Sequence, residues 1–216
     1  MPPKPPILPP DLAPVEDLPA LVRTLEEGEG LEGALFSRAV LAGEDLSGLS
    51  FRGCRFDRCR LVGCDFTGAA FQDCVFSGCD CSNSRFAEGE LFRVLWTGCK
   101  AVGADLHRAA LREASLEDCQ LSLANLNGAR LWSVELRSCG LEGAFCSGCT
   151  VRNLALKDCR LVETNLFQTP LAGVDLTTCT LQGLVLSESL TELRGAVLDR
   201  FQAAELARRF GVIVRD

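Results

Sequence analysis

Cysteine is the residue type in this chain with the greatest capacity for chemistry, because 13 of the 216 residues are cysteines. Cys146 and Cys149 have the C-x-x-C spacing of redox-active thiols. A reactive thiol needs solvent exposure and a neighbouring positive charge, and a zinc site needs four converging ligands. Either chemistry therefore depends on how the surrounding elements place the cysteines and the single histidine, His107.

A five-residue repeat carries almost all of these residues. Every residue from Leu31 to Leu186 whose number ends in 1 or 6 is apolar. Of the 31 residues from Ala34 to Leu184 whose number ends in 4 or 9, 27 are small, and Glu44 is one exception. A period of five matches neither the helical period of about 3.6 nor the strand period of about 2. It indicates a chain that takes one short extended step and then turns a corner.

Four such steps close a square coil of twenty residues. Within each step the small and the large residue lie two apart, so both point to the inside of the coil. Fourteen of the 20 glycines fall two residues after the large position, where a corner requires positive φ. The sequence thus predicts an all-β solenoid of about eight coils, stacked at about 4.8 Å.

All 13 cysteines fall at inward positions of this repeat, and His107 falls at an outward one. Seven of the cysteines recur at the same point of successive coils: Cys59, Cys79, Cys99, Cys119, Cys139, Cys159 and Cys179. We interpret them as a buried ladder of small apolar fillers rather than as a redox array. The sequence accordingly predicts no metal, no cofactor and no catalytic residue.

The two ends of the chain differ from the repeat. Residues 1–30 form a proline-rich arm, which could alternatively serve as a proline-motif ligand, and a capping helix over 18–26 that Asp17 begins. Residues 31–200 form the repeat domain, with a frame slip of two residues in 187–194. Residues 201–216 form a helix over 201–210, which Gly211 ends, and a short apolar strand over 212–214.

The repeat resembles the pentapeptide-repeat family, whose unit is A-(D/N)-L-x-x. Residues 104–108 and 124–128 show this unit, and the resemblance covers residues 31 to about 200. It implies a right-handed quadrilateral β-helix, here with short N- and C-terminal capping helices. The C-terminal end resembles the quinolone-resistance (Qnr-type) members, in which such a helix mediates a tail-to-tail homodimer. The residues that would form this interface are Phe201, Leu206, Phe210, Val212 and Ile213. The alternative is an intramolecular cap.

One outward column has the composition of a protein interface. It alternates arginine with aromatic residues, both of which are enriched at binding hot spots. The candidate interaction surface consists of Arg52, Phe92, Arg112, Trp132 and Arg152. A ladder of side chains that stack only on each other is the alternative interpretation. We find no nucleophile–base pair or phosphate loop that would indicate an enzyme, and no basic stripe that would indicate direct nucleic-acid binding.

Charge decides between two functions. The resemblance to Qnr-type proteins implies a mimic of DNA that binds DNA gyrase or topoisomerase IV and protects against quinolones. The net charge is −7, but residues 31–200 carry 21 acids and 17 bases, and no loop interrupts the repeats from 31 to 186. The sequence therefore favours a protein-interaction scaffold with an unknown partner. No signal peptide or membrane-spanning segment is present, so we expect a cytoplasmic protein without a membrane partner.

Overall fold

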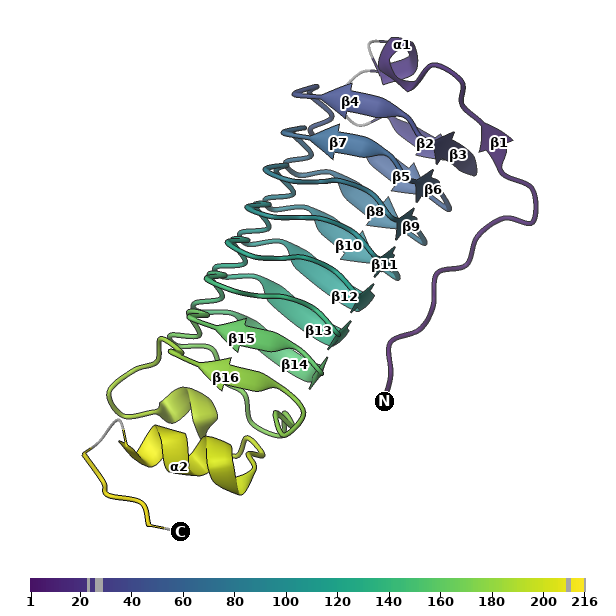
Figure 1. Ribbon diagram of the computed structural model, residues 1–216. Coiled ribbons are helices and arrows are strands. Elements are labelled where there is room, and N and C mark those ends of the chain that lie inside the picture. The colour runs from purple at the N-terminus through teal and green to yellow at the C-terminus, as the bar shows by residue number, and fades with distance from the viewer. Residues whose placement is uncertain (23, 26–28, 209–210, 216) are drawn as a thin grey trace.

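The structure, a computed structural model, describes residues 1–22, 24–25, 29–208 and 211–215. The repeats wind into a rod of about eight stacked coils, with a short helix at each end (Figure 1). The predicted quadrilateral β-helix is confirmed. Each coil has four sides, which we name faces A to D in chain order.

Faces A and B carry most of the strands. Face A consists of β2 (Gly30–Glu32), β5 (Ser50–Arg52), β8 (Ala70–Gln72), β10 (Glu90–Phe92) and the first halves of β12 (Ala110–Glu117), β13 (Arg130–Arg137) and β14 (Thr150–Lys157). Face B consists of β3 (Ala34–Ser37), β6 (Arg55–Asp57), β9 (Val75–Ser77), β11 (Leu95–Thr97) and the second halves of β12, β13 and β14. All of these strands pair in parallel, each with the strand twenty residues away.

Faces C and D have shorter extended steps. Face C contains β4 (Val40–Ala42), β7 (Arg60–Val62), β15 (Arg160–Val162) and β16 (Thr180–Gln182). Face D is held by isolated parallel bridges, from Asp45–Asp65 to Asn165–Val185. At every corner from Gly33 to Gly173, the residue two after the large position has positive φ. Glycine adopts this conformation without strain, which explains its place in the repeat.

The core changes character along the rod. In the N-terminal half, phenylalanine rings of successive coils stack, with ring centroids 4.9 Å apart for Phe51 and Phe71 and 4.5 Å apart for Phe56 and Phe76. Trp96 ends this aromatic series. The following leucine-rich half contains an apolar cavity of about 50 Å³.

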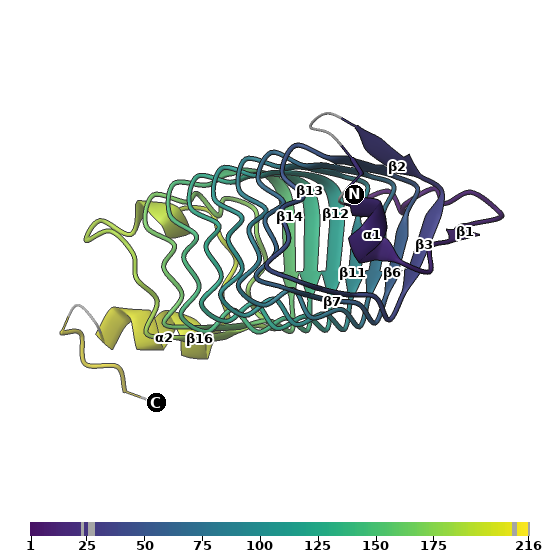
Figure 2. The same cartoon turned by 90° about the horizontal axis from the view of Figure 1, so that it is seen from above.

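The N-terminal arm runs back along the outside of the rod, from the first coil towards the far end (Figures 1 and 2). Strand β1 (Ala13–Pro14) joins the arm to β3. Helix α1 (Leu18–Val22) begins at Asp17, whose carboxylate accepts the Ala20 N–H at 2.9 Å. This helix is shorter than predicted, and part of the remainder lies outside the described residues. The buried side chains of Leu18 and Val22 cover the first coil, and Glu44 is half-buried nearby.

The C-terminal end resumes the coil after an insertion. Asp175 pairs with Val197, twenty-two residues away, so the predicted slip of two residues is confirmed. A 3-10 helix, η1 (Thr191–Leu193), occupies the insertion. Helix α2 (Arg200–Arg208) follows and ends before Gly211, whose φ is 75°. Residues 212–214, where the sequence predicts a strand, have no strand pairing among the residues that the structure describes.

Asp199 and Gln202 attach helix α2 to the last coil. The Asp199 carboxylate accepts the Gln202 N–H at 2.8 Å, and the Gln202 side chain in turn accepts the Asp199 N–H at 3.0 Å. This reciprocal pair is a capping box. The Gln202 amide also donates to the carbonyls of Leu176 and Cys179, each at 2.8 Å. No helix among the described residues is long and apolar enough to cross a membrane.

Candidate interaction surface

The column of outward residues on face A stands in continuous register. Phe92 pairs with Arg112, Arg112 with Trp132, and Trp132 with Arg152. Arg52 lies two coils away from Phe92, with Gln72 between them. The structure therefore brings four of the five predicted surface residues together and leaves Arg52 apart.

Trp132 is sandwiched between two arginines. The Arg112 guanidinium carbon lies 4.4 Å from the ring centroid, and that of Arg152 lies 5.6 Å from it. Each cation–π contact contributes about 0.5–1 kcal/mol at such a site. The ring is half-buried as a result, whereas Arg112 and Arg152 are exposed. The surface thus presents guanidinium groups held by an aromatic ring, rather than the exposed aromatic residues expected from the sequence.

Phe92 has a different arginine on its ring. The Arg93 guanidinium carbon lies 4.3 Å from the Phe92 centroid, and its nitrogens bind both oxygens of Asp73, at 2.6 and 2.5 Å. This bidentate contact lowers the pKa of the Asp73 carboxyl, so the buried Asp73 stays charged. Sequence reasoning missed Asp73 and Arg93 because they occupy corner positions, where the repeat favours glycine for its positive φ but assigns no role to a side chain.

Arg130 adds a further cation to the same face. In β13 the inward residue Leu131 lies between Arg130 and Trp132, so both of these point outward from face A. Arg130 is exposed. Arg112, Arg130 and Arg152 therefore form a guanidinium cluster on three successive coils. Guanidinium groups bind carboxylates through two parallel hydrogen bonds, so this cluster is suited to acidic groups on a partner.

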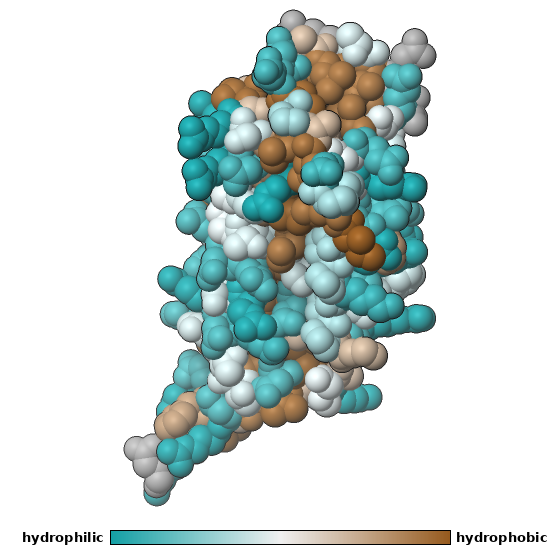
Figure 3. Space-filling model, turned by 90° about the vertical axis from the view of Figure 1, so that its right-hand side faces the viewer, coloured by the Kyte–Doolittle hydropathy of each residue, from teal (hydrophilic) through white to brown (hydrophobic). Residues whose placement is uncertain are grey.

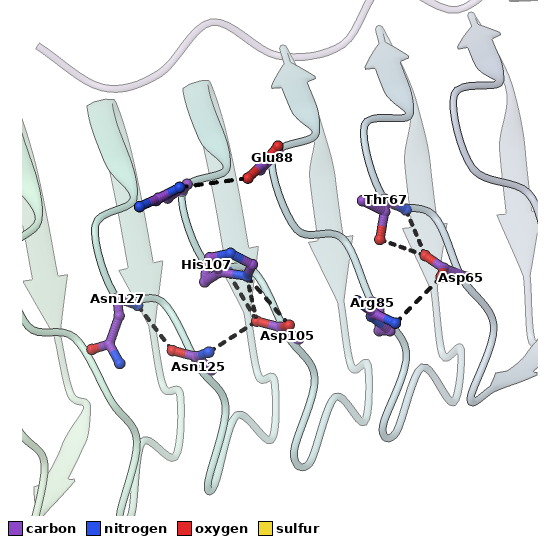
Figure 4. Close-up of polar contacts among 9 residues, drawn as sticks. Asp65, Thr67, Arg85, Glu88, Asp105, His107, Asn125 and Asn127 are labelled. Carbon is purple, nitrogen blue, oxygen red and sulfur yellow. Dashed lines mark hydrogen bonds and ion pairs between the residues drawn. The ribbon is translucent and has the colours of Figure 1, made fainter.

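The aspartates of face D engage in local polar contacts (Figure 4). Asp65 accepts the Thr67 N–H at 2.9 Å and pairs with Arg85 at 3.6 Å. Asp105 accepts from Asn125 at 3.0 Å and from the His107 N–H at 3.1 Å. These carboxylates stabilise the local turns and pair with neighbouring side chains, so they do not form an acidic stripe.

The cysteine ladder lies inside the rod. All 13 cysteines are buried free thiols. The ladder thiols donate to main-chain carbonyls of the preceding coil, as Cys59 does to Phe36 at 3.2 Å and Cys139 to Leu116 at 3.3 Å. Burial raises the pKa of Cys146 in the C-x-x-C sequence. The described residues contain no group of three or more potential metal ligands, and the arrangement satisfies carbonyls rather than exposing thiolates.

The C-terminal end leaves apolar side chains in solvent. Phe201 is 68% exposed and Ile213 is 83% exposed. Val212 is also exposed, and Leu206 is half-buried on α2. Phe210, the fifth residue of the predicted dimer interface, lies outside the described residues.

Glu192 closes the last coil and was not identified from the sequence. Its side chain is 2% exposed and accepts the N–H groups of Gln168 at 2.8 Å and Ser187 at 3.2 Å. The Ser187 hydroxyl donates to its second oxygen at 2.7 Å. Burial would raise the pKa of this carboxyl, but the N–H donors outweigh burial and the net shift is downward. The frame slip hid Glu192, since the repeat pattern assigns no position to it.

Comparison with known proteins matches residues 49–126 to the family model described as a pentapeptide repeat region. Among solved structures, a trypsin-treated form of QnrB1, a plasmid-mediated fluoroquinolone resistance protein, is 27% identical, covers 95% of this chain and 100% of its own, and has a TM-score of 0.46. HetL from the cyanobacterium Nostoc is 18% identical, with coverages of 85% and 98% and a TM-score of 0.27. Comparison with curated protein sequences gives no match.

Proposed function

We propose that this pentapeptide-repeat protein is a non-enzymatic interaction scaffold and that face A carries its partner-binding surface. The observation that carries the proposal is the Arg112–Trp132–Arg152 stack. Aromatic and arginine side chains dominate binding hot spots, and here the ring restricts both guanidinium groups before any partner arrives. Less conformational entropy is then lost on binding.

The chemistry of this surface favours an acidic partner. Arg112, Arg130 and Arg152 are all exposed, and none of them has an ion pair among the described residues. Parallel coils lie about 4.8 Å apart, so Arg112 and Arg152 present their charges at a repeat of about 10 Å. An extended acidic segment of a protein would place carboxylates at a comparable spacing.

Two matched variants test this proposal. Phe92→Ser with Trp132→Ser removes two rings from face A, and Phe145→Ser with Phe167→Ser removes two exposed rings from face D. Proteins recovered with the wild-type chain by crosslinking and affinity capture should be lost at least about tenfold with the face A variant. The face D variant should retain them. Equal recovery with both variants, or loss only with the face D variant, would contradict the proposal.

Topoisomerase protection is the alternative function, and the paired carboxylates of face D do not favour it. Asp65 pairs with Arg85, and Arg85 and Asn125 interrupt the column on either side of Asp105, whereas a mimic of DNA requires a continuous, uncompensated acidic surface. Purified DNA gyrase is therefore the control protein in the same experiment. We expect no rescue of gyrase supercoiling from a fluoroquinolone at micromolar concentrations of the chain. Rescue that survives the face A variant would favour the alternative.

We further propose that the C-terminal end joins two copies of the chain tail to tail. Phe201 and Ile213 supply the exposed apolar surface, and such surfaces mark association sites when they are contiguous. Light scattering should show a dimer for the wild type and a monomer for Phe201→Asp with Ile213→Asp. Val40→Asp, an exposed position on the first coil, is the matched control and should remain dimeric. An unchanged mass for the tail variant would refute this interface.

A further inference from the structure

The N-terminal arm contacts one corner of the solenoid at regular intervals. The Ile7 N–H donates to Asp73 at 2.9 Å, and the Lys4 N–H donates to Glu113 at 2.8 Å. Met1 exchanges two hydrogen bonds with Asn153, at 3.3 and 2.8 Å. Contacts on the arm are three residues apart, while their partners on the rod are forty residues apart, which is two coils.

These two intervals have the same length. A polyproline-II helix has three residues per turn and rises about 3.1 Å per residue, so one turn spans about 9.3 Å. Two coils of the solenoid span about 9.6 Å. A β-strand would present its N–H groups every two residues, or about 6.7 Å, which matches neither one coil nor two. The corner is thus commensurate with polyproline II.

The sequence of the arm follows the same period. Proline pairs at 2–3 and 5–6 separate Met1, Lys4 and Ile7, so from residue 1 to residue 7 the residues that retain an N–H are those that face acceptors. Pro3, Pro6 and Pro9 are half-buried, whereas Pro2 and Pro5 are exposed. The half-buried prolines therefore mark one edge of the arm, which runs along the side of the rod that lies at the right in Figure 1 and faces the viewer in Figure 3.

The corner residues are adapted to hold the arm. The side chains that accept hydrogen bonds from the arm lie on alternate coils, and residues of the coils between them hold two of these side chains in place. Arg93 binds both oxygens of Asp73, and Ser133 accepts from the Asn153 amide at 3.2 Å. Gly53 lies under the arm, where a Cβ would come within 2.8 Å of Pro9. A side chain at this position would collide with the proline ring.

We propose that this corner of the solenoid is a recognition groove for polyproline-II segments, with residues 1–9 of this chain as its occupant. The groove requires an N–H at every third residue and accepts proline pairs between them. Segments of the form X-Pro-Pro satisfy this rule, and segments with another spacing do not. The groove adjoins the guanidinium cluster, because Glu113 follows Arg112 and Asn153 follows Arg152 in the chain, but its occupation by the arm does not depend on the proposed partner.

Hydrogen exchange of the full chain tests the groove directly. Within residues 2–9, only Lys4, Ile7 and Leu8 have an amide N–H. We expect the amides of Lys4 and Ile7 to exchange at least about tenfold more slowly than that of Leu8. Asp73→Ala should remove the protection of Ile7, and Glu113→Ala should remove that of Lys4 alone. Glu88→Ala, a corner acid on another column that pairs with Arg108, should change neither amide.

Insertions in the arm test whether protection depends on the spacing of its N–H groups or only on contact between the arm and the rod. One proline inserted after Pro6 shifts Lys4 out of phase and should abolish its protection while Ile7 remains protected. Lys-Pro-Pro inserted at the same place restores the phase, so Lys4 should be protected again, now opposite Asn153. Equal protection of Lys4 in both insertion variants, or protection of Leu8 equal to that of Ile7, would overturn the proposal. Neither variant alters a residue of the solenoid, so misfolding of the rod does not confound the result.

Discussion

Phe71→Ala is expected to destabilise the solenoid by about 3–5 kcal/mol. The Phe71 ring is 1% exposed, stacks on Phe51 with centroids 4.9 Å apart and meets the edges of Phe66 and Phe76 at 5.6 and 5.5 Å. Rings on both neighbouring faces are fixed by their own stacks, so the cavity left by alanine cannot close. Urea unfolding followed by circular dichroism gives the free energy of unfolding.

Leu131→Ala is the matched control for this prediction. Leu131 occupies the same inward position on face A, three coils further along, and lines the existing apolar cavity. It has fewer contacts to lose there, so we expect a cost of about 2 kcal/mol. A cost for Leu131→Ala equal to or greater than that for Phe71→Ala would show that the leucine-rich half is packed as tightly as the aromatic half.

The inward half of this molecule was predictable because the coil repeats its geometry. The pairing of a small residue with a large one recurs about thirty times along the chain. A single deviation such as Glu44 therefore does not obscure the five-residue frame. The frame slip was also visible, since it displaces apolar residues by two, and the Asp175–Val197 pairing confirms its size. The handedness came from the resemblance to a known family.

For the outward side chains, the sequence predicts only which residues stack above one another in a column, and not the contacts between them. Register alone placed Arg112, Trp132 and Arg152 on neighbouring coils, but it could not show that the two guanidinium groups cover the ring. The contact between Ile7 and Asp73 joins residues 66 positions apart, and neither residue deviates from its local pattern. Its only signal in the sequence is the three-residue period of the proline pairs, which becomes meaningful once the coil spacing is known.

The prediction with the second largest effect concerns Glu192. Glu192→Ala is expected to destabilise the chain by about 2–4 kcal/mol, because it removes a buried carboxylate and leaves the part-buried N–H groups of Gln168 and Ser187 without this acceptor. Glu192→Gln retains one oxygen for these donors and should cost about 1 kcal/mol. Glu188→Ala changes an exposed acid in the same segment and should stay within about 0.5 kcal/mol of the wild type.

The pH dependence separates the charge of Glu192 from its shape. The folded-state pKa of this carboxyl lies below its ordinary value of 4.5, so folding favours the ionised form. The resulting stabilisation is fully present above the unfolded-state pKa and is lost as pH falls through the folded-state pKa. The difference in unfolding free energy between the wild type and Glu192→Gln should therefore be constant near neutral pH and shrink below about pH 4.5. A difference that stays constant down to pH 3 would assign the role of Glu192 to packing, because a purely steric contribution has no proton linkage.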